Sequence, residues 1–209
     1  MKIAVFGGTG KTGQHFVRKV LEAGHDVVAL ARTPAKLVAR HERLKVVSGD
    51  ATDPACVAQV ISGSDVVVSL LGPAKGQPAF AISRATQNMI DAMNSSGARR
   101  LVISAGAGVG DPEDQPKLIN HLISALLKLS ARDAYEDMMK VASLVRQSGL
   151  DWTIVRVPML TDDLATGQVK VGMVGKGTGP RISREDMADF ILKQAQNGAF
   201  TGKAPMISN

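Results

Sequence analysis

The chain has 209 residues, a length that suits one domain or one domain with a small appendage. Hydrophobic residues make up 44% and charged residues 21%, so the chain can bury a substantial core and a disordered composition is excluded. No apolar run approaches the ~18 residues of a membrane span, and the short apolar run at the amino terminus predicts no signal peptide. Cys56 is the only cysteine, which excludes an intrachain disulfide and favours a reducing, cytoplasmic location.

The net charge of +6 raises the question of nucleic-acid binding. The basic residues are scattered, however, and aromatic residues, on which bases stack, make up only 3%. A basic enzyme that binds a polyanionic cofactor fits this composition better than a nucleic-acid-binding protein. No metal site is predicted, because the histidines lie far apart without ligand spacing, at His15, His25, His41 and His121.

The amino terminus carries the strongest functional signal. Residues 2–6, KIAVF, form a short apolar run typical of a strand buried on both faces. A G-x-x-G-x-x-G turn follows at Gly7, Gly10 and Gly13, and residues 14–24 then have helical spacing. Strand, glycine turn and helix together form the dinucleotide-binding fingerprint, in which the backbone approaches a pyrophosphate at the helix amino terminus.

Gly10-Lys11-Thr12 also resembles the end of a phosphate-binding loop for ATP or GTP, whose pattern is G-x-x-x-x-G-K-[ST]. The first glycine of that pattern would fall at position 5, which is Val5 inside the predicted strand. Because the loop would be too short to wrap a triphosphate, the dinucleotide interpretation is preferred.

Beyond the first helix, predicted strands and helices alternate regularly. Thr52 or Asp53 is the expected cap of helix 51–63, and Ser183 is the expected cap of helix 182–198. The predicted strands are 26–32, 44–50, 64–72, 99–106 and 151–160, and the predicted helices are 33–41, 51–63, 80–97 and 182–198.

Strands that alternate with helices pair in parallel through right-handed crossovers. Most of these strands are continuous apolar runs, which need helices on both faces of the sheet. We therefore expect an α/β fold, a doubly wound parallel sheet of the Rossmann type with strand order 3-2-1-4-5-6. Residues 1–209 are expected to form one NAD(P)-binding domain with a small carboxyl-terminal substrate-side region.

Two stretches depart from this alternation and are expected on the substrate side, at about 107–134 and 157–182. Residues 107–116 are rich in glycine, proline and acids and follow the fifth strand, where substrates sit in such sheets. Residues 117–130 have a wide apolar helical face, for which core packing is the first interpretation and a lid or a dimer surface the alternative. Residues 168–179 suggest a short hairpin.

The end of the second strand points to the phosphorylated cofactor. NAD-selective sites place an acidic residue there, whereas an arginine suits the 2′-phosphate of NADP. Here Arg32 ends the strand, Lys36 stands one turn further on, and no carboxylate lies between Val27 and Arg40. Arg32 can hold a phosphate through two hydrogen bonds and Lys36 adds a second charge, so NADP(H) is the predicted cofactor. The alternative is that Arg32 is only a solvated residue at a strand end.

Two further strand ends contribute to the predicted site. Asp50 ends the third strand and is placed to meet the adenine edge. Leu70, Leu71 and Gly72 end the fourth strand, where the backbone would line the middle of the cofactor.

The glycine turn, Arg32, Gly49-Asp50 and Leu71-Gly72 occur together with the run SGLDWTIVRVP at residues 148–158. On these residues the chain resembles the atypical short-chain dehydrogenase/reductases, in their NAD(P)H-binding, NmrA-like branch. Within that branch it is similar to the NADPH-dependent flavin reductases, also called biliverdin-IXβ reductases. The resemblance covers essentially the whole chain.

The resemblance implies a cofactor contact for each of a set of residues, with Ser104 as the candidate catalytic residue beside the nicotinamide. These contacts are Gly7, Thr9, Gly10, Lys11, Thr12 and Gly13 in the turn, Arg32 and Lys36 at the phosphate, Asp50 and Ala51 at adenine, Leu71 and Gly72 along the ribose, and Ser104, Val157, Pro158 and Met159 around the nicotinamide. The chain departs from the flavin reductases at two places. Their further hydroxyl residues after the position of Ser104 are replaced by Ala105 and Gly106, and a histidine of their substrate pocket is replaced by Met159.

Typical short-chain dehydrogenases use a serine with a Y-x-x-x-K pair, in which i,i+4 spacing puts Tyr and Lys on one helix face. Tyr135 is the only tyrosine of this chain, and Met139 stands at the position of the lysine. Lys140 is one residue further on, about 140° around the helix from Tyr135. We therefore interpret Tyr135 as an ordinary, partly buried tyrosine rather than a proton donor.

The missing Tyr–Lys pair limits the kinds of reduction that we expect the site to catalyse. Reducing a carbonyl to an alcohol needs a positioned acid, whereas reducing a flavin or quinone needs only hydride transfer to an electron-poor ring. We predict an NADPH-dependent reductase of flavins or similar planar acceptors, acting on a small molecule as a monomer or homodimer. The alternative is a non-catalytic NADP(H)-sensing regulator of the NmrA-like kind, and the missing pair counts against a sugar epimerase or dehydratase.

Overall fold

The computed structural model describes residues 1–74, 76–116 and 131–209, and the expectations for residues 117–130 lie outside this part. The described helices are α1 (Lys11–Glu22), α2 (Pro54–Ile61), α3 (Ala81–Ser96), α5 (Arg132–Gln147) and α6 (Arg184–Asn197), with a 3-10 turn η1 (Pro34–Lys36). The described strands are β1 (Lys2–Phe6), β2 (Asp26–Ala31), β3 (Leu44–Ser48), β4 (Val66–Ser69), β5 (Arg100–Gly106), β6 (Asp151–Val157), β7 (Met159–Thr161), β8 (Lys170–Gly172), β9 (Arg181–Ser183) and β10 (Met206–Ser208).

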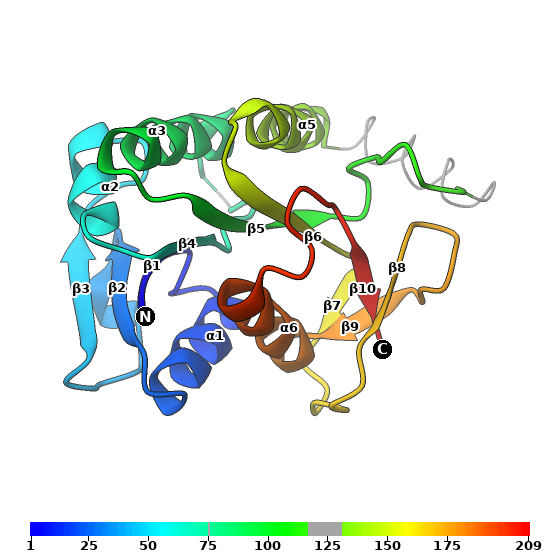
Figure 1. Ribbon diagram of the computed structural model, residues 1–209, viewed down its shortest axis with the longest axis horizontal. Coiled ribbons are helices and arrows are strands. Elements are labelled where there is room, and N and C mark those ends of the chain that lie inside the picture. Colours follow the sequence, from blue (N-terminus) through cyan, green and yellow to red (C-terminus); the bar gives the residue numbers. More distant parts are fainter. Residues whose placement is uncertain (75, 117–130) are drawn as a thin grey trace.

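The main sheet has the order β3-β2-β1-β4-β5-β6-β10-β8, and β7 and β9 pair in a separate two-stranded sheet (Figure 1). The predicted order 3-2-1-4-5-6 is therefore confirmed, and β10 and β8 extend it. Phe6 is level with Leu30 of β2 and with Ser69 of β4, in parallel register. Because β3 and β5 are also parallel to their neighbours, the carboxyl ends of these strands lie along one edge of the sheet.

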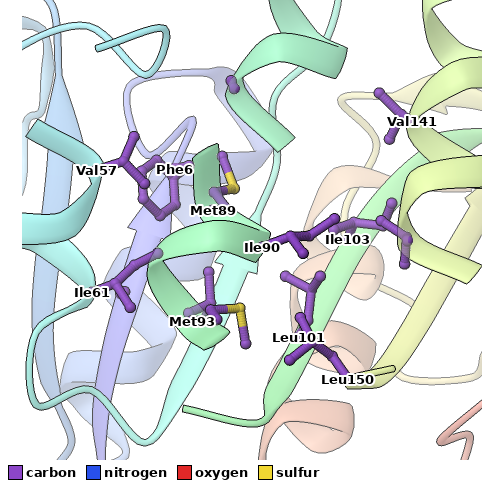
Figure 2. Packing of buried hydrophobic residues seen from close by; sticks show 14 of the residues in the cluster. Phe6, Val57, Ile61, Met89, Ile90, Met93, Leu101, Ile103, Val141 and Leu150 are labelled. Carbon is purple, nitrogen blue, oxygen red and sulfur yellow. The ribbon is translucent and has the colours of Figure 1, made fainter. Parts of the chain in front are cut away.

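Helices cover both faces of the sheet, as the continuous apolar strands predict. In Figure 1, α2, α3 and α5 lie over one face, and α1 and α6 lie over the other. Two apolar clusters fill the two interfaces. Figure 2 shows the first, in which Met89 and Met93 of α3 pack near Phe6 of β1 and Leu101 of β5. The amphipathic helices are thus fixed by burial, which contributes roughly 1.5–3 kcal/mol per large apolar side chain.

Two of the described helices, α2 and α6, start at side-chain caps expected from the sequence. The Asp53 side chain accepts a hydrogen bond from the amide of Ala55 at 2.9 Å and caps α2, which decides between the two predicted caps. The Ser183 hydroxyl accepts from the amide of Asp186 at 3.0 Å and caps α6, as predicted. Such caps typically stabilise a helix by about 1 kcal/mol.

The predicted helix over 33–41 is wrong, since η1 is the only helical turn there. Proline fits the first turn of a helix, but beyond it only Leu37 is buried, so the segment has no apolar stripe to hold a helix on the sheet. The Arg40 guanidinium instead donates to the carbonyls of Leu37 and Ala39.

The predicted strand over 151–160 is divided at Pro158, which has no amide hydrogen for the sheet. β6 therefore ends at Val157, and β7 pairs with β9 outside the main sheet.

The predicted hairpin over 168–179 reduces to a bridge between Met173 and Lys176, because β8 pairs with β10 instead. β10 lies in the short carboxyl-terminal stretch, for which no strand was predicted from the sequence.

Candidate cofactor-binding site

The glycine turn between β1 and α1 is held by close backbone packing. Gly7 has φ +83°, and a Cβ there would lie 2.6 Å from the carbonyl carbon of Leu70 at the end of β4. A Cβ on Gly13 would overlap the carbonyl oxygen of Gly7. These two glycines therefore allow α1 and β4 to approach the turn, since any larger residue would force the three segments apart.

Gly10 differs from its two neighbours in the motif. It is exposed, its φ is −73°, and the only nearby atom that a Cβ would meet is the Gly7 carbonyl oxygen at 3.4 Å. Gly10 occupies the N-cap of α1 without a side-chain cap, and the first turn of the helix contains no acid. Uncapped N–H groups and the positive end of the helix dipole attract an anion, so the turn fits the pyrophosphate of a dinucleotide.

The other turn residues differ in exposure. Thr12 is buried at the start of α1, and Thr9 is half-buried, with a carbonyl that accepts from the Gln14 side chain at 3.5 Å. Lys11 is exposed, and its ammonium donates to Asp162 Oδ2 at 2.6 Å. The Lys11 side chain thus contacts the segment that follows β7.

Asp162 joins two cations beside the start of α1. Its second oxygen, Oδ1, accepts from the Arg184 guanidinium at 2.6 Å. Hydrogen bonding from Lys11, with the positive charge of Arg184, holds the pKa of Asp162 below its ordinary value. The segment 159–162 is therefore tied both to the glycine turn and to the start of α6.

The carboxyl ends of β2 and β3 bring Arg32 and Asp50 together. Arg32 is exposed directly after β2, and Asp50 lies two residues after the neighbouring β3. The amide and hydroxyl of Thr52 both donate to Asp50 Oδ1, at 2.8 and 2.7 Å. These bonds, with a smaller contribution from the Arg32 charge, lower the pKa of the Asp50 carboxyl. Asp50 is thus a fixed anionic acceptor near the positive charge of the exposed Arg32.

The remaining predicted cofactor residues lie along the same edge of the sheet. The Leu71 amide nitrogen would lie 3.0 Å from a Cβ on Gly7, so the end of β4 borders the glycine turn, whereas nothing would lie within 4 Å of a Cβ on Gly72. Ala51 is half-buried, and its carbonyl accepts from Asn88 of α3 at 3.0 Å. Lys36 is exposed at the end of η1.

The predicted nicotinamide residues lie at the ends of β5 and β6. Ser104 is half-buried in β5 and pairs in register with Val155. Val157 is buried at the end of β6, and its carbonyl accepts from the amide of Ala107 at 2.8 Å. Pro158 is half-buried, whereas Met159 is 63% exposed at the start of β7. Apolar and backbone groups therefore predominate here.

A buried ion pair fixes the loop after β5. Arg156 of β6 has no exposed surface, and its guanidinium binds the two carboxylate oxygens of Asp114 at 2.6 and 2.8 Å. Arg156 also donates to the carbonyls of Val109 and Ala204. Burial raises the pKa of Asp114, but bonds from Arg156 and from backbone amides outweigh it, so the net pKa is below the ordinary value.

Tyr135 and Lys140 both lie on α5, and their side chains have different surroundings. A Cβ on Gly108, in the loop after β5, would lie 3.9 Å from the Tyr135 ring. The Lys140 ammonium lies 5.8 Å from the centroid of the Phe80 ring, next to the start of α3. The lysine is therefore engaged by a cation–π contact with Phe80.

The polar residues that hold the loop after β5 and the segment after β7 are not among the residues predicted from the sequence. Arg156 belongs to the predicted apolar strand 151–160, and an arginine inside such a run signals a buried ion pair. Asp114, Asp162 and Arg184 gave no comparable local signal, because their partners lie far away in the sequence.

The described residues contain neither a metal-binding cluster nor a membrane-spanning helix. Residues 1–74, 76–116 and 131–209 contain no group of three or more His, Cys, Asp or Glu side chains that could hold a metal ion. No helix in this part of the chain is long and apolar enough to cross a membrane.

A parallel sheet with a glycine turn at its first strand end and an uncapped helix behind it defines a Rossmann-type nucleotide-binding protein. The model of the NAD(P)H-binding family matches residues 7–198, from the first glycine of the turn to the end of α6. The chain belongs to this NAD(P)H-binding family.

Known proteins similar to this chain include oxidoreductases. UPF0659 protein C216.03 of Schizosaccharomyces pombe is 28% identical over 205 residues, which cover 90% of this chain and 81% of that protein. A 3-beta-hydroxysteroid dehydrogenase of Mycolicibacterium neoaurum is 32% identical over 120 residues, 52% of this chain but only 32% of the dehydrogenase. The crystal structure of a short-chain dehydrogenases/reductase from Veillonella parvula in complex with NADP has a TM-score of 0.80 at 17% identity and covers 100% of this chain and 94% of that one. The similarity to this structure shows that the two chains share a fold.

Proposed function

We propose that the protein is an NADPH-dependent reductase that transfers hydride to a flavin or a similar planar acceptor. Two features of one site carry the proposal. The glycine turn lies at the strand ends with Gly10 exposed, and the sequence has Met139 where a carbonyl reductase has the lysine of its Tyr–Lys pair. Membership of the NAD(P)H-binding family and the likeness to oxidoreductases support the general class.

The preference for NADPH rests on Arg32 and Lys36. Both side chains are exposed just after β2, where the 2′-phosphate of NADP would lie. Asp50, two residues after the neighbouring β3, is held by Thr52, and in this proposal its carboxylate accepts a hydrogen bond from the adenine side of the cofactor. Two cations without an acid at the end of β2 favour a phosphate over the free ribose hydroxyls of NADH.

The proposed acceptor follows from the groups at the ends of β5 and β6. When bound, the nicotinamide supplies the hydride. Ser104 offers one hydroxyl, and Ala105, Gly106, Val157 and Pro158 offer none. A single hydroxyl orients the ring but cannot replace a lowered-pKa tyrosine as acid, whereas a flavin takes its proton from water after hydride transfer.

Steady-state oxidation of NADPH, with FMN or FAD as acceptor and without either, tests the proposal. We expect flavin-dependent NADPH oxidation that is absent from a Gly10→Val variant, in which the proposed pyrophosphate position is blocked. Binding of NADPH by calorimetry without any turnover of FMN, FAD or a quinone would contradict the reductase proposal and support an NADP(H)-sensing regulator.

A further inference from the structure

The segment 33–41, which carries Lys36, has one apolar anchor. Leu37 is fully buried in a core cluster and Ala39 packs partly against it, whereas the rest of the segment borders two open surface grooves, both lined by Arg40 and His41. Arg40 bonds to carbonyls within the segment and so adds no link to the rest of the molecule. Besides the Leu37 anchor, hydrogen bonds from other elements to the backbone of this segment therefore set its position relative to the glycine turn.

Gln14, in the second turn of α1, supplies such bonds on both sides of Leu37. Its Nε2 donates to the carbonyl of Lys36 at 2.5 Å, and its Oε1 accepts from the amide of Val38 at 3.0 Å. The same Nε2 lies 3.5 Å from the carbonyl of Thr9 in the glycine turn. One side-chain amide thus joins the turn, α1 and the backbone of Lys36.

We propose that Gln14 is a positioning residue for cofactor selectivity, which places Lys36 beside Arg32 so that both cations meet the 2′-phosphate. The inference rests on the proposed use of NADPH. An exposed lysine on a loosely held segment loses entropy when it binds a phosphate, and fixing its backbone beforehand reduces that cost. NADH lacks the phosphate, so its affinity does not depend on where Lys36 lies.

The test compares the dissociation constants of NADPH and NADH for the parent and for Gln14→Leu. Leucine is similar in size and favours helix, but it forms neither amide bond. We expect Gln14→Leu to weaken NADPH about tenfold and to leave NADH unchanged, so that the ratio of the two constants falls. The matched control is Gln87→Leu, an exposed glutamine of α3 that bonds only to Asp91 within its own helix and should change neither constant.

A double-mutant cycle with Lys36→Ala shows whether Gln14 acts through the lysine. We expect Lys36→Ala to cost about tenfold in NADPH affinity, and adding Gln14→Leu to it should cost little more. Equal loss of NADPH and NADH, or independent losses in the cycle, would overturn the inference, because Gln14 would then support the turn rather than Lys36.

The failure of this inference differs from the failure of the proposed cofactor. If the parent prefers NADPH and Gln14→Leu keeps the same ratio, only the role of Gln14 is wrong. If the parent binds NADPH and NADH equally, the cofactor proposal is wrong, and the inference is wrong with it.

Discussion

The two ends of the candidate site are held by different forces. The glycine end, residues 7–13 with the end of β4, is fixed by backbone packing so close that Gly7 and Gly13 have no space for a Cβ. The loop end, residues 107–116 and 157–182, combines buried apolar side chains, such as Val109 and Ile182, with ion pairs, chiefly the buried Arg156–Asp114 pair. Backbone sterics therefore set the glycine end, whereas a buried ion pair distinguishes the loop end.

This difference has a consequence for what each end tolerates. A substitution at the glycine end acts through volume, and its effect is independent of pH and salt. A substitution at the loop end acts through charge, and its effect depends on whether a buried partner is left unpaired. Variants at both ends and a pH titration separate these two behaviours.

The largest expected effect is at Gly10. We expect Gly10→Val to weaken NADPH and NADH alike by more than about a hundredfold, because the side chain would occupy the space where the backbone meets the pyrophosphate. The fold should survive, since a Cβ at this φ of −73° makes only an ordinary contact at 3.4 Å. Calorimetry measures the affinity for NADPH and NADH, and circular dichroism on the same sample shows whether the variant is folded.

Gly13→Val is the matched control, because its Cβ would overlap the Gly7 carbonyl and should unfold the protein. Normal binding by Gly10→Val, or a folded Gly13→Val that binds NADPH, would contradict the assignment of the two glycines.

The second prediction concerns the buried pair at the loop end. Arg156→Leu should lower the free energy of unfolding by about 3–5 kcal/mol, because Asp114 keeps its charge without its partner. Urea unfolding followed by the fluorescence of Trp152, the only tryptophan, measures the change. The double variant Arg156→Leu/Asp114→Leu should recover part of the loss, because no unpaired carboxylate is left, although the amides of Asp111 and Val174 then lose Asp114 as their acceptor. No recovery would mean that Arg156 matters for its bonds to the Val109 and Ala204 carbonyls instead.

The glycine end was predictable from sequence and the loop end was not, for one physical reason. The turn at Gly7–Gly13 and the caps Asp53 and Ser183 act between residues a few positions apart, so the spacing alone reveals them. The strand order followed from the repeated alternation of strand and helix. Arg156 and Asp114 are 42 residues apart, and nothing local to either shows that they meet.

The segment 33–41 is a second example of a distant contact that the sequence does not reveal. It does not form the predicted helix, and its backbone is bonded by Gln14 of α1, 22 residues from Lys36. The predicted cofactor residues themselves lie along one edge of the sheet, yet their contact with a cofactor stays a prediction.

The third prediction tests the cation at the end of β2. Arg32→Ala should weaken NADPH about ten- to a hundredfold and leave NADH nearly unchanged, since hydrogen bonds to charged groups contribute roughly 1.5–3 kcal/mol. Titration of both cofactors against parent and variant measures the two constants. Equal losses for NADPH and NADH would mean that Arg32 does not contact the 2′-phosphate.

The fourth prediction uses pH to separate the two ends. Hydrogen bonds lower the pKa of Asp114 and Asp186 in the folded protein, despite burial. Their contribution to stability is therefore complete above the ordinary carboxyl pKa of about 3.9 and is lost as the pH falls through the lower folded pKa. Asp114→Asn should be less stable than the parent at neutral pH but should lose less stability between about pH 5 and pH 3. Parallel pH profiles for the two proteins would show that Asp114 does not titrate in this way.

The smallest expected effect is at Tyr135, beside the loop end. If hydride passes directly to a flavin-like acceptor, no side chain has to titrate in the chemical step, so Tyr135→Phe should keep flavin reduction within a few-fold of the parent. Ser104→Ala should be similarly mild, because its hydroxyl orients the ring. Loss of a true general acid typically costs about 10²–10⁴-fold. A thousandfold drop in turnover for Tyr135→Phe, with NADPH affinity intact, would restore a dehydrogenase-type mechanism.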